Sequence, residues 1–134
     1  MEFRKHPERT GQFILSAPII YAMIVPLVFA DLCLEFYHRL CFPLYGIPLV
    51  NRGKYIRIDR HKLSYLTPLE KFNCVYCGYA NGFLNYATNI AGDTEKYWCA
   101  IKHEQRDGFH NPEHHKSFVE YNDKKTFEKK FQAK

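Results

Sequence analysis

The chain has 134 residues, of which 46% are hydrophobic and 16% aromatic, and it carries a formal net charge of +5. A chain of this length folds into one compact domain at most, and about 85 residues remain for a water-exposed core once the apolar N-terminal region is set aside. The basic residues are spread along the chain without a recognisable nucleic-acid module. Membrane lipid is therefore expected as a partner, and nucleic acid is not.

The N-terminal region predicts attachment to a membrane. Twenty consecutive residues without a charge run from Gly11 to Ala30, which is about the number that a helix needs to cross the hydrocarbon core. No small-x-small cleavage site follows, so an uncleaved anchor is favoured over a signal peptide. The next apolar stretch, Leu40–Val50, is too short to cross as a helix and is interrupted by prolines, so it is expected to lie in the interface or to pack back on the first segment.

Basic residues flank the apolar region on both sides. More of them follow it than precede it, which favours a membrane protein with the C-terminal part of the chain in the cytoplasm. A re-entrant hairpin that returns to the same face is the alternative. The expected organisation is a basic N-terminus (1–10), a membrane segment with an apolar interfacial stretch (11–50), a metal-binding domain (51–119) and a charged tail (120–134).

Three ionisable residues follow the uncharged stretch. Asp31, Glu35 and His38 are spaced at i, i+4 and i+7, so a helix that continues past Ala30 would place them on one face. They form a candidate interfacial polar site, interpreted either as a wetted face or as a ligand set or proton relay. Glu35-x-x-His38 has the spacing of di-iron bundles, but the second such motif and the further carboxylates that those sites need are absent from the sequence.

Two spaced pairs of side chains predict a metal site. Cys74-x2-Cys77 followed by Gly78 has the form of a knuckle, in which a tight turn brings two thiolates to one ion. Cys99-x3-His103 has a standard spacing for a second pair. The metal ligands expected are therefore Cys74, Cys77, Cys99 and His103.

The elements around these residues predict a small α+β fold. Residues 54–59 alternate apolar and charged side chains, which is typical of a short strand, and residues 81–97 repeat their apolar positions at helical spacing. The expected architecture is an N-terminal membrane helix or re-entrant hairpin followed by a small metal-knuckle domain with one main helix.

Zinc is the metal expected first, because a shell of three thiolates and one imidazole is tetrahedral and closed. Iron, or a [2Fe–2S] cluster, is the alternative. Disulfides would leave one of the five cysteines unpaired, and a thioredoxin-like redox pair lacks its βαβ setting. Additional candidate ligands are His110, His114 and His115, which also fit a surface loop.

The strings CFPLYGIP, DRHKLSYL, NCVYCGYANG and YWCAIKH resemble those of an uncharacterised family of small bacterial membrane-associated proteins. The resemblance covers about residues 38–104. It implies a bacterial membrane-associated protein with this cysteine pattern, and hence location at the bacterial inner membrane. It implies no activity.

The function expected from these features is that of a membrane-anchored, zinc-binding structural or adaptor protein, whose further partner would be a larger membrane complex. An iron-based electron-transfer protein is the first alternative, and a membrane-bound metalloenzyme is the second. No catalytic residues are predicted, because neither a general base nor a substrate pocket is visible in the sequence.

Overall fold

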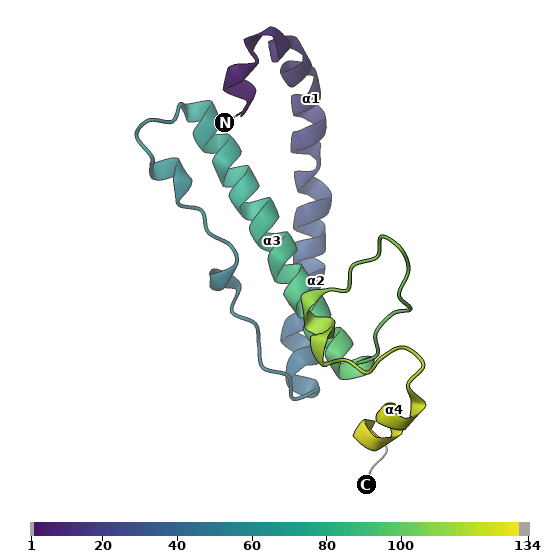
Figure 1. Ribbon diagram of the computed structural model, residues 1–134. Coiled ribbons are helices and arrows are strands. Elements are labelled where there is room, and N and C mark those ends of the chain that lie inside the picture. The colour runs from purple at the N-terminus through teal and green to yellow at the C-terminus, as the bar shows by residue number, and fades with distance from the viewer. Residues whose placement is uncertain (1, 132–134) are drawn as a thin grey trace. The chain divides into compact units, whose positions relative to one another are not determined.

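The computed structural model of the protein describes residues 2–131, which are mostly helical. The α-helices are α1 (Thr10–Ala22), α2 (Ile24–Leu44), α3 (Pro68–Trp98) and α4 (Lys124–Phe131), joined by loops and short 3-10 helices (Figure 1). Residues 2–131 contain no β-strand, only one isolated bridge between Ile101 and Val119. The prediction of a small α+β fold is therefore wrong.

The predicted knuckle is also wrong, because its residues lie inside helix α3. Gly78, which follows Cys77, lies within α3 and not in a tight turn. A Cβ added to Gly78 would lie 2.8 Å from the backbone oxygen of Arg57, and one added to Gly82 would lie 2.8 Å from the backbone oxygen of Tyr55. Both glycines thus allow the segment between α2 and α3 to approach the helix closely, which a side chain would prevent.

The predicted strand at 54–59 is part of this connecting segment. Tyr55 and Ile56 are half-buried, whereas Lys54 and Arg57 on either side of them are exposed. The segment packs against a helix instead of a second strand, so no ladder of backbone hydrogen bonds forms. A short alternation of apolar and charged residues fits both a strand and a segment packed on a helix, so the pattern did not distinguish the two.

Helices α1 and α2 follow one another almost without interruption. The break falls at Met23, close to Pro26, which has no N–H group to donate to the carbonyl of Ala22. Pro7–Leu44 is long and apolar enough to cross a membrane, and none of its most apolar window is buried. The stretch Leu40–Val50 was expected to lie in the interface or to pack back on the first segment. Its first five residues, to Leu44, belong to α2, and Gly46 follows the helix at a φ of +69°.

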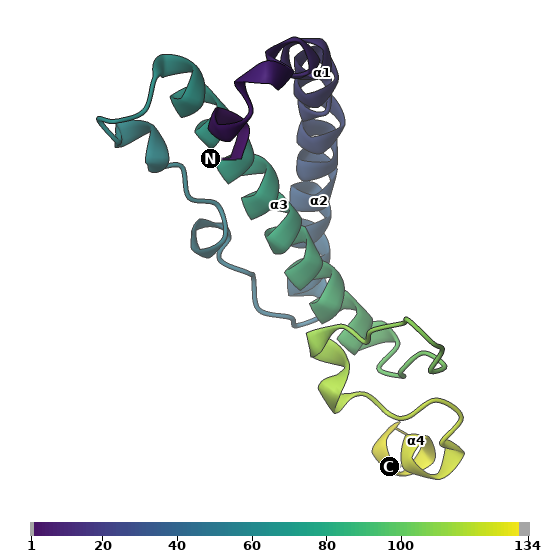
Figure 2. The same cartoon turned by 45° about the horizontal axis from the view of Figure 1, so that its top comes forward.

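Residues 1–87 and 88–134 are two compact units, and helix α3 runs from the first into the second. In the first unit α3 runs in the same direction as α1 and α2 but at an angle to them, and the segment between α2 and α3 returns alongside α3 (Figures 1 and 2). Contacts from α3 to the N-terminal part advance in the same order along both: Glu70 to Arg4, Asn73 to Tyr21, Tyr79 to Asp31, and Tyr86 to Glu35 and His38.

The second unit contains the end of α3, a loop, the 3-10 helix η5 (Glu113–Ser117) and α4. Its buried side chains are those of Ile90, His115, Phe118 and Val119. Lys102 N donates to Val119 O at 2.8 Å, and Val119 N donates to Ala100 O at 2.9 Å. These two backbone bonds hold the chain after α3 against the chain after η5.

Helix α3 begins with a capping box that also carries an ion pair. The backbone N–H of Thr67 donates to the Glu70 carboxylate at 2.9 Å, and Arg4 donates to the same carboxylate through Nε at 2.6 Å and Nη2 at 2.5 Å. The guanidinium of Arg4 and the hydrogen bonds from Thr67 lower the pKa of Glu70 to about 2.

This low pKa predicts a loss of stability in acid. Because the pKa is below its ordinary value of 4.5, the contribution of Glu70 to the free energy of unfolding is complete above pH 4.5 and falls as the pH drops toward 2. Thermal unfolding of wild type and Glu70→Gln should therefore differ most near neutral pH and converge as the pH approaches 2. The exposed Glu128→Gln variant is the control. A constant difference across this range would contradict the assignment.

Candidate metal site and polar network

Three ligand-type side chains meet in the second unit. Oxygen or nitrogen atoms of Glu95, His103 and His115 all lie within 4.8 Å of one another. Glu95 lies on the last turn of α3, His103 follows the segment bonded to Val119, and His115 lies in η5. Two imidazoles and a carboxylate are donors that zinc and other divalent transition metals accept.

The imidazole of His115 is held firmly in this group. Its side chain is 1% exposed and its ring stacks on Phe118 with 4.7 Å between centroids. Its Nε2 lies 3.1 Å from both carboxylate oxygens of Glu95. A ring fixed by packing and hydrogen bonding needs little reorganisation when it binds an ion.

His114 approaches Glu95 from the other side. Its Nε2 lies 2.7 Å from Oε2 of Glu95, and its ring atoms would lie 3.0 Å from a Cβ added to Gly92. Gly92 weakens the helix by its own propensity, but it makes room for this histidine. Gly92 therefore contributes to the site by allowing His114 to approach Glu95.

The carboxylate of Glu95 is kept ionised. Burial raises its pKa, but the hydrogen bonds to His114 and His115 outweigh burial and lower the pKa below its ordinary value. A metal ligand must be deprotonated, so the arrangement favours the form that binds an ion.

An open cavity of about 520 Å³ lies beside the group. Glu95, Cys99 and His103 line it together with Phe109 and Tyr121. An ion held by the three ligands would therefore have its remaining side facing a hollow that water enters.

The structure divides the predicted ligands between the two units. Cys74 and Cys77 lie one turn apart on α3 in the first unit, while Cys99 and His103 belong to the second. Among the described residues, the group of close ligand atoms includes His103 and the additional candidate His115, and it includes no cysteine. His110 lies apart from this group, exposed, with Nδ1 3.2 Å from Gly108 O.

Glu95 is the member of the group that sequence analysis missed. Glutamate is common on helix surfaces, so a single one carries little signal. The usable signal was its spacing, since Glu95, Cys99 and His103 follow one another at intervals of four residues.

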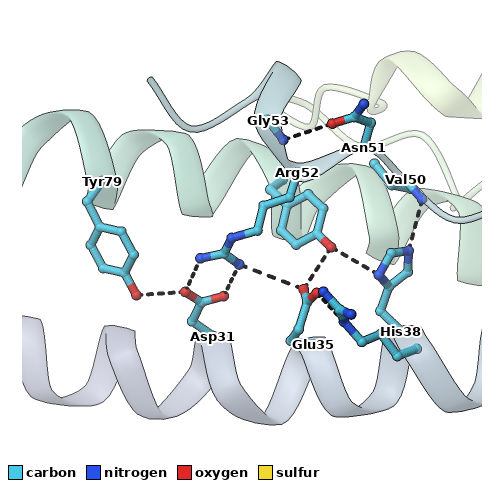
Figure 3. A network of polar contacts seen from close by, with 10 residues as sticks. Asp31, Glu35, His38, Val50, Asn51, Arg52, Gly53 and Tyr79 are labelled. Atoms are coloured by element: carbon cyan, nitrogen blue, oxygen red, sulfur yellow. Dashed lines mark hydrogen bonds and ion pairs between the residues drawn. The ribbon is translucent and has the colours of Figure 1, made fainter. Parts of the chain in front are cut away.

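A second polar cluster lies in the first unit, around the residues of the predicted interfacial site (Figure 3). As expected, Asp31, Glu35 and His38 share one face of a helix, α2. Arg52 donates from Nη2 to Oδ2 of Asp31 at 2.5 Å and from Nη1 to Oδ1, and Tyr79 donates to Oδ2 at 2.8 Å. Asp31 is 8% exposed, and both oxygens of its carboxylate accept hydrogen bonds from these donors.

His38 has both ring nitrogens engaged. The backbone N–H of Val50 donates to Nε2 at 3.0 Å, so Nε2 is an acceptor and the proton lies on Nδ1, which donates to the hydroxyl of Tyr86 at 3.0 Å. Tyr86 in turn donates to Oε2 of Glu35 at 2.9 Å. Burial and this bond raise the pKa of Tyr86 to about 12.

This chain of hydrogen bonds ends on a backbone amide, which cannot pass a proton on. The hydrogen bonds of the cluster connect α2, α3 and the segment between these two helices. Neither nitrogen of His38 has a lone pair left for a metal ion in this arrangement.

Comparison with protein-family models, with curated proteins and with solved structures finds no match for the chain.

Proposed function

We propose that this is a membrane-anchored metal-binding protein with a structural or adaptor role. Helices α1 and α2 attach the first unit to a bilayer, and the second unit binds one divalent metal ion, zinc in the first place, through Glu95, His103 and His115. The observation that carries the proposal is the approach of these three ligand atoms to within 4.8 Å of one another.

Membrane attachment is supported by the distribution of apolar side chains in α1 and α2. Leu15, Ile19, Phe29 and Leu44 are each about 70–80% exposed, whereas the buried residues of α2 are the polar Asp31 and His38 together with Phe42. A helix in water buries its apolar face and exposes its polar one. The reverse arrangement suits a helix whose outer surface contacts lipid.

Zinc is favoured because its sites use nitrogen and oxygen ligands without a redox requirement. The same two imidazoles and carboxylate also suit ferrous iron, which leaves the electron-transfer alternative open to test. A metal at this position would tie the end of α3 to the His103 segment and to η5, three parts of a unit that buries few apolar side chains. Small domains commonly gain stability in this way.

The test is metal analysis and zinc titration of the full-length protein extracted from membranes. One zinc per chain is expected, and His115→Ala should weaken zinc binding at least about 10–100-fold, the loss seen even for outer-shell groups. His110→Ala is the matched control, because His110 lies outside the group, and it should bind zinc as wild type does. Stoichiometric iron in the isolated protein would favour iron over zinc as the metal. If His115→Ala bound zinc as tightly as wild type does, the proposed site would be contradicted.

A further inference from the structure

We propose that Cys99 is the fourth ligand of the metal site, so that the ion is held by two imidazoles, one carboxylate and one thiolate. The inference rests on the proposed function, because it completes the ligand set of the same site. It also assigns a role to one of the five cysteines, all of which are free thiols.

The end of α3 places Cys99 beside Glu95. Cys99 is the residue after the last one of the helix, and its backbone N–H donates to the carbonyl of Glu95 at 2.7 Å. This bond continues the helical spacing by one residue. Side chains four residues apart on a helix lie on the same face, one turn from each other.

The chain then bends so that His103 returns to the same place. Ile101 N donates to Cys99 O at 2.9 Å, and Lys102 N donates to Val119 O. Cys99, Glu95 and His103 line one cavity. The thiol is exposed on that side, so it can turn toward an ion without first leaving a packed position.

The chemistry of the three close ligands leaves one position to fill. Zinc in closed sites is tetrahedral, and thiolate is among its preferred donors, at about 2.3 Å from the ion. Binding would release the thiol proton to solvent and form one sulfur–metal bond. His114 is the competing donor, because its Nε2 lies 2.7 Å from Glu95, but it is not among the residues that line the cavity with Cys99, Glu95 and His103.

Cobalt(II) is a suitable probe, because a thiolate ligand gives it a charge-transfer band in the near ultraviolet that nitrogen and oxygen ligands do not. Full-length protein in detergent, stripped of metal under reducing conditions, should show this band together with the visible bands of tetrahedral cobalt. Cys99→Ser should lose the charge-transfer band, keep the visible bands and bind cobalt at least about tenfold more weakly. Cys33→Ser, on α2, is the control and should match wild type.

The outcomes separate the two proposals. Visible cobalt bands without a charge-transfer band in wild type would overturn the role of Cys99 and leave the metal site in place. Loss of the band in Cys74→Ser or Cys77→Ser, with the band kept in Cys99→Ser, would overturn it in favour of the pair on the first unit. Failure of wild type to bind cobalt or zinc would overturn both.

Discussion

Replacing Asp31 with alanine is expected to lower the free energy of unfolding by about 2–3 kcal/mol, because the guanidinium of Arg52 loses its bidentate partner. Tyr79 loses its acceptor in the same variant. The estimate is below that for a fully buried pair, since the side chain of Arg52 is 35% exposed. Unfolding of the full-length protein in a mild detergent, followed by circular dichroism, measures the change.

A double-mutant cycle tests whether the two residues act as a pair. Asp31→Ala and Arg52→Ala together should cost about 1–2 kcal/mol less than the sum of the single changes, because the second substitution removes the charge that the first left unpaired. Arg39→Ala is the control, since Arg39 is exposed and donates only to Glu35 on its own helix. Additive effects of Asp31 and Arg52 would show that the contact contributes nothing to folding.

The second large effect is expected at Gly82, where alanine should destabilise the first unit by about 1–3 kcal/mol. The new Cβ would lie 2.8 Å from Tyr55 O and 2.8 Å from the Cα of Ile56. Both are backbone atoms, so the connecting segment must move as a whole. Unfolding in detergent, as above, measures the loss.

Gly11→Ala is the matched control for Gly82→Ala. Gly11 lies in helix α1, and nothing lies within 4 Å of a Cβ placed there. Alanine at this position should be neutral or stabilise by up to about 1 kcal/mol through its higher helix propensity. If both variants behaved alike, the close approach of the connecting segment to α3 would be refuted.

The apolar region and the shared face of Asp31, Glu35 and His38 could be predicted because both depend on local spacing along one helix. The length of an uncharged run and a period near 3.6 residues need no knowledge of the rest of the chain. The fold class could not be predicted in this way. Gly78 suggested a turn, but its role is set by Arg57, twenty-one residues earlier in the sequence.

The metal site shows the same limit. Cys99 and His103 were singled out by their spacing, yet the structure groups His103 with Glu95 and His115. That grouping depends on backbone hydrogen bonds between residues 100–102 and Val119. No periodic pattern in the sequence predicts hydrogen bonds between two loops. Spacing singled out His103, whereas its approach to Glu95 and His115 depends on where α3 and η5 lie in the folded chain.

The common direction of α2 and α3 has a consequence for synthesis of the chain. The partners of Asp31 are Arg52, 21 residues later, and Tyr79, 48 residues later. At about 5–20 residues per second, ribosomes add 48 residues in roughly 2–10 s. Until Arg52 and then Tyr79 have been added, the carboxylate of Asp31 on α2 lacks one or both of these partners. The nascent protein is therefore most vulnerable to misinsertion and aggregation before α3 is complete, and truncation ahead of Tyr79 should leave a product that quality-control proteases remove.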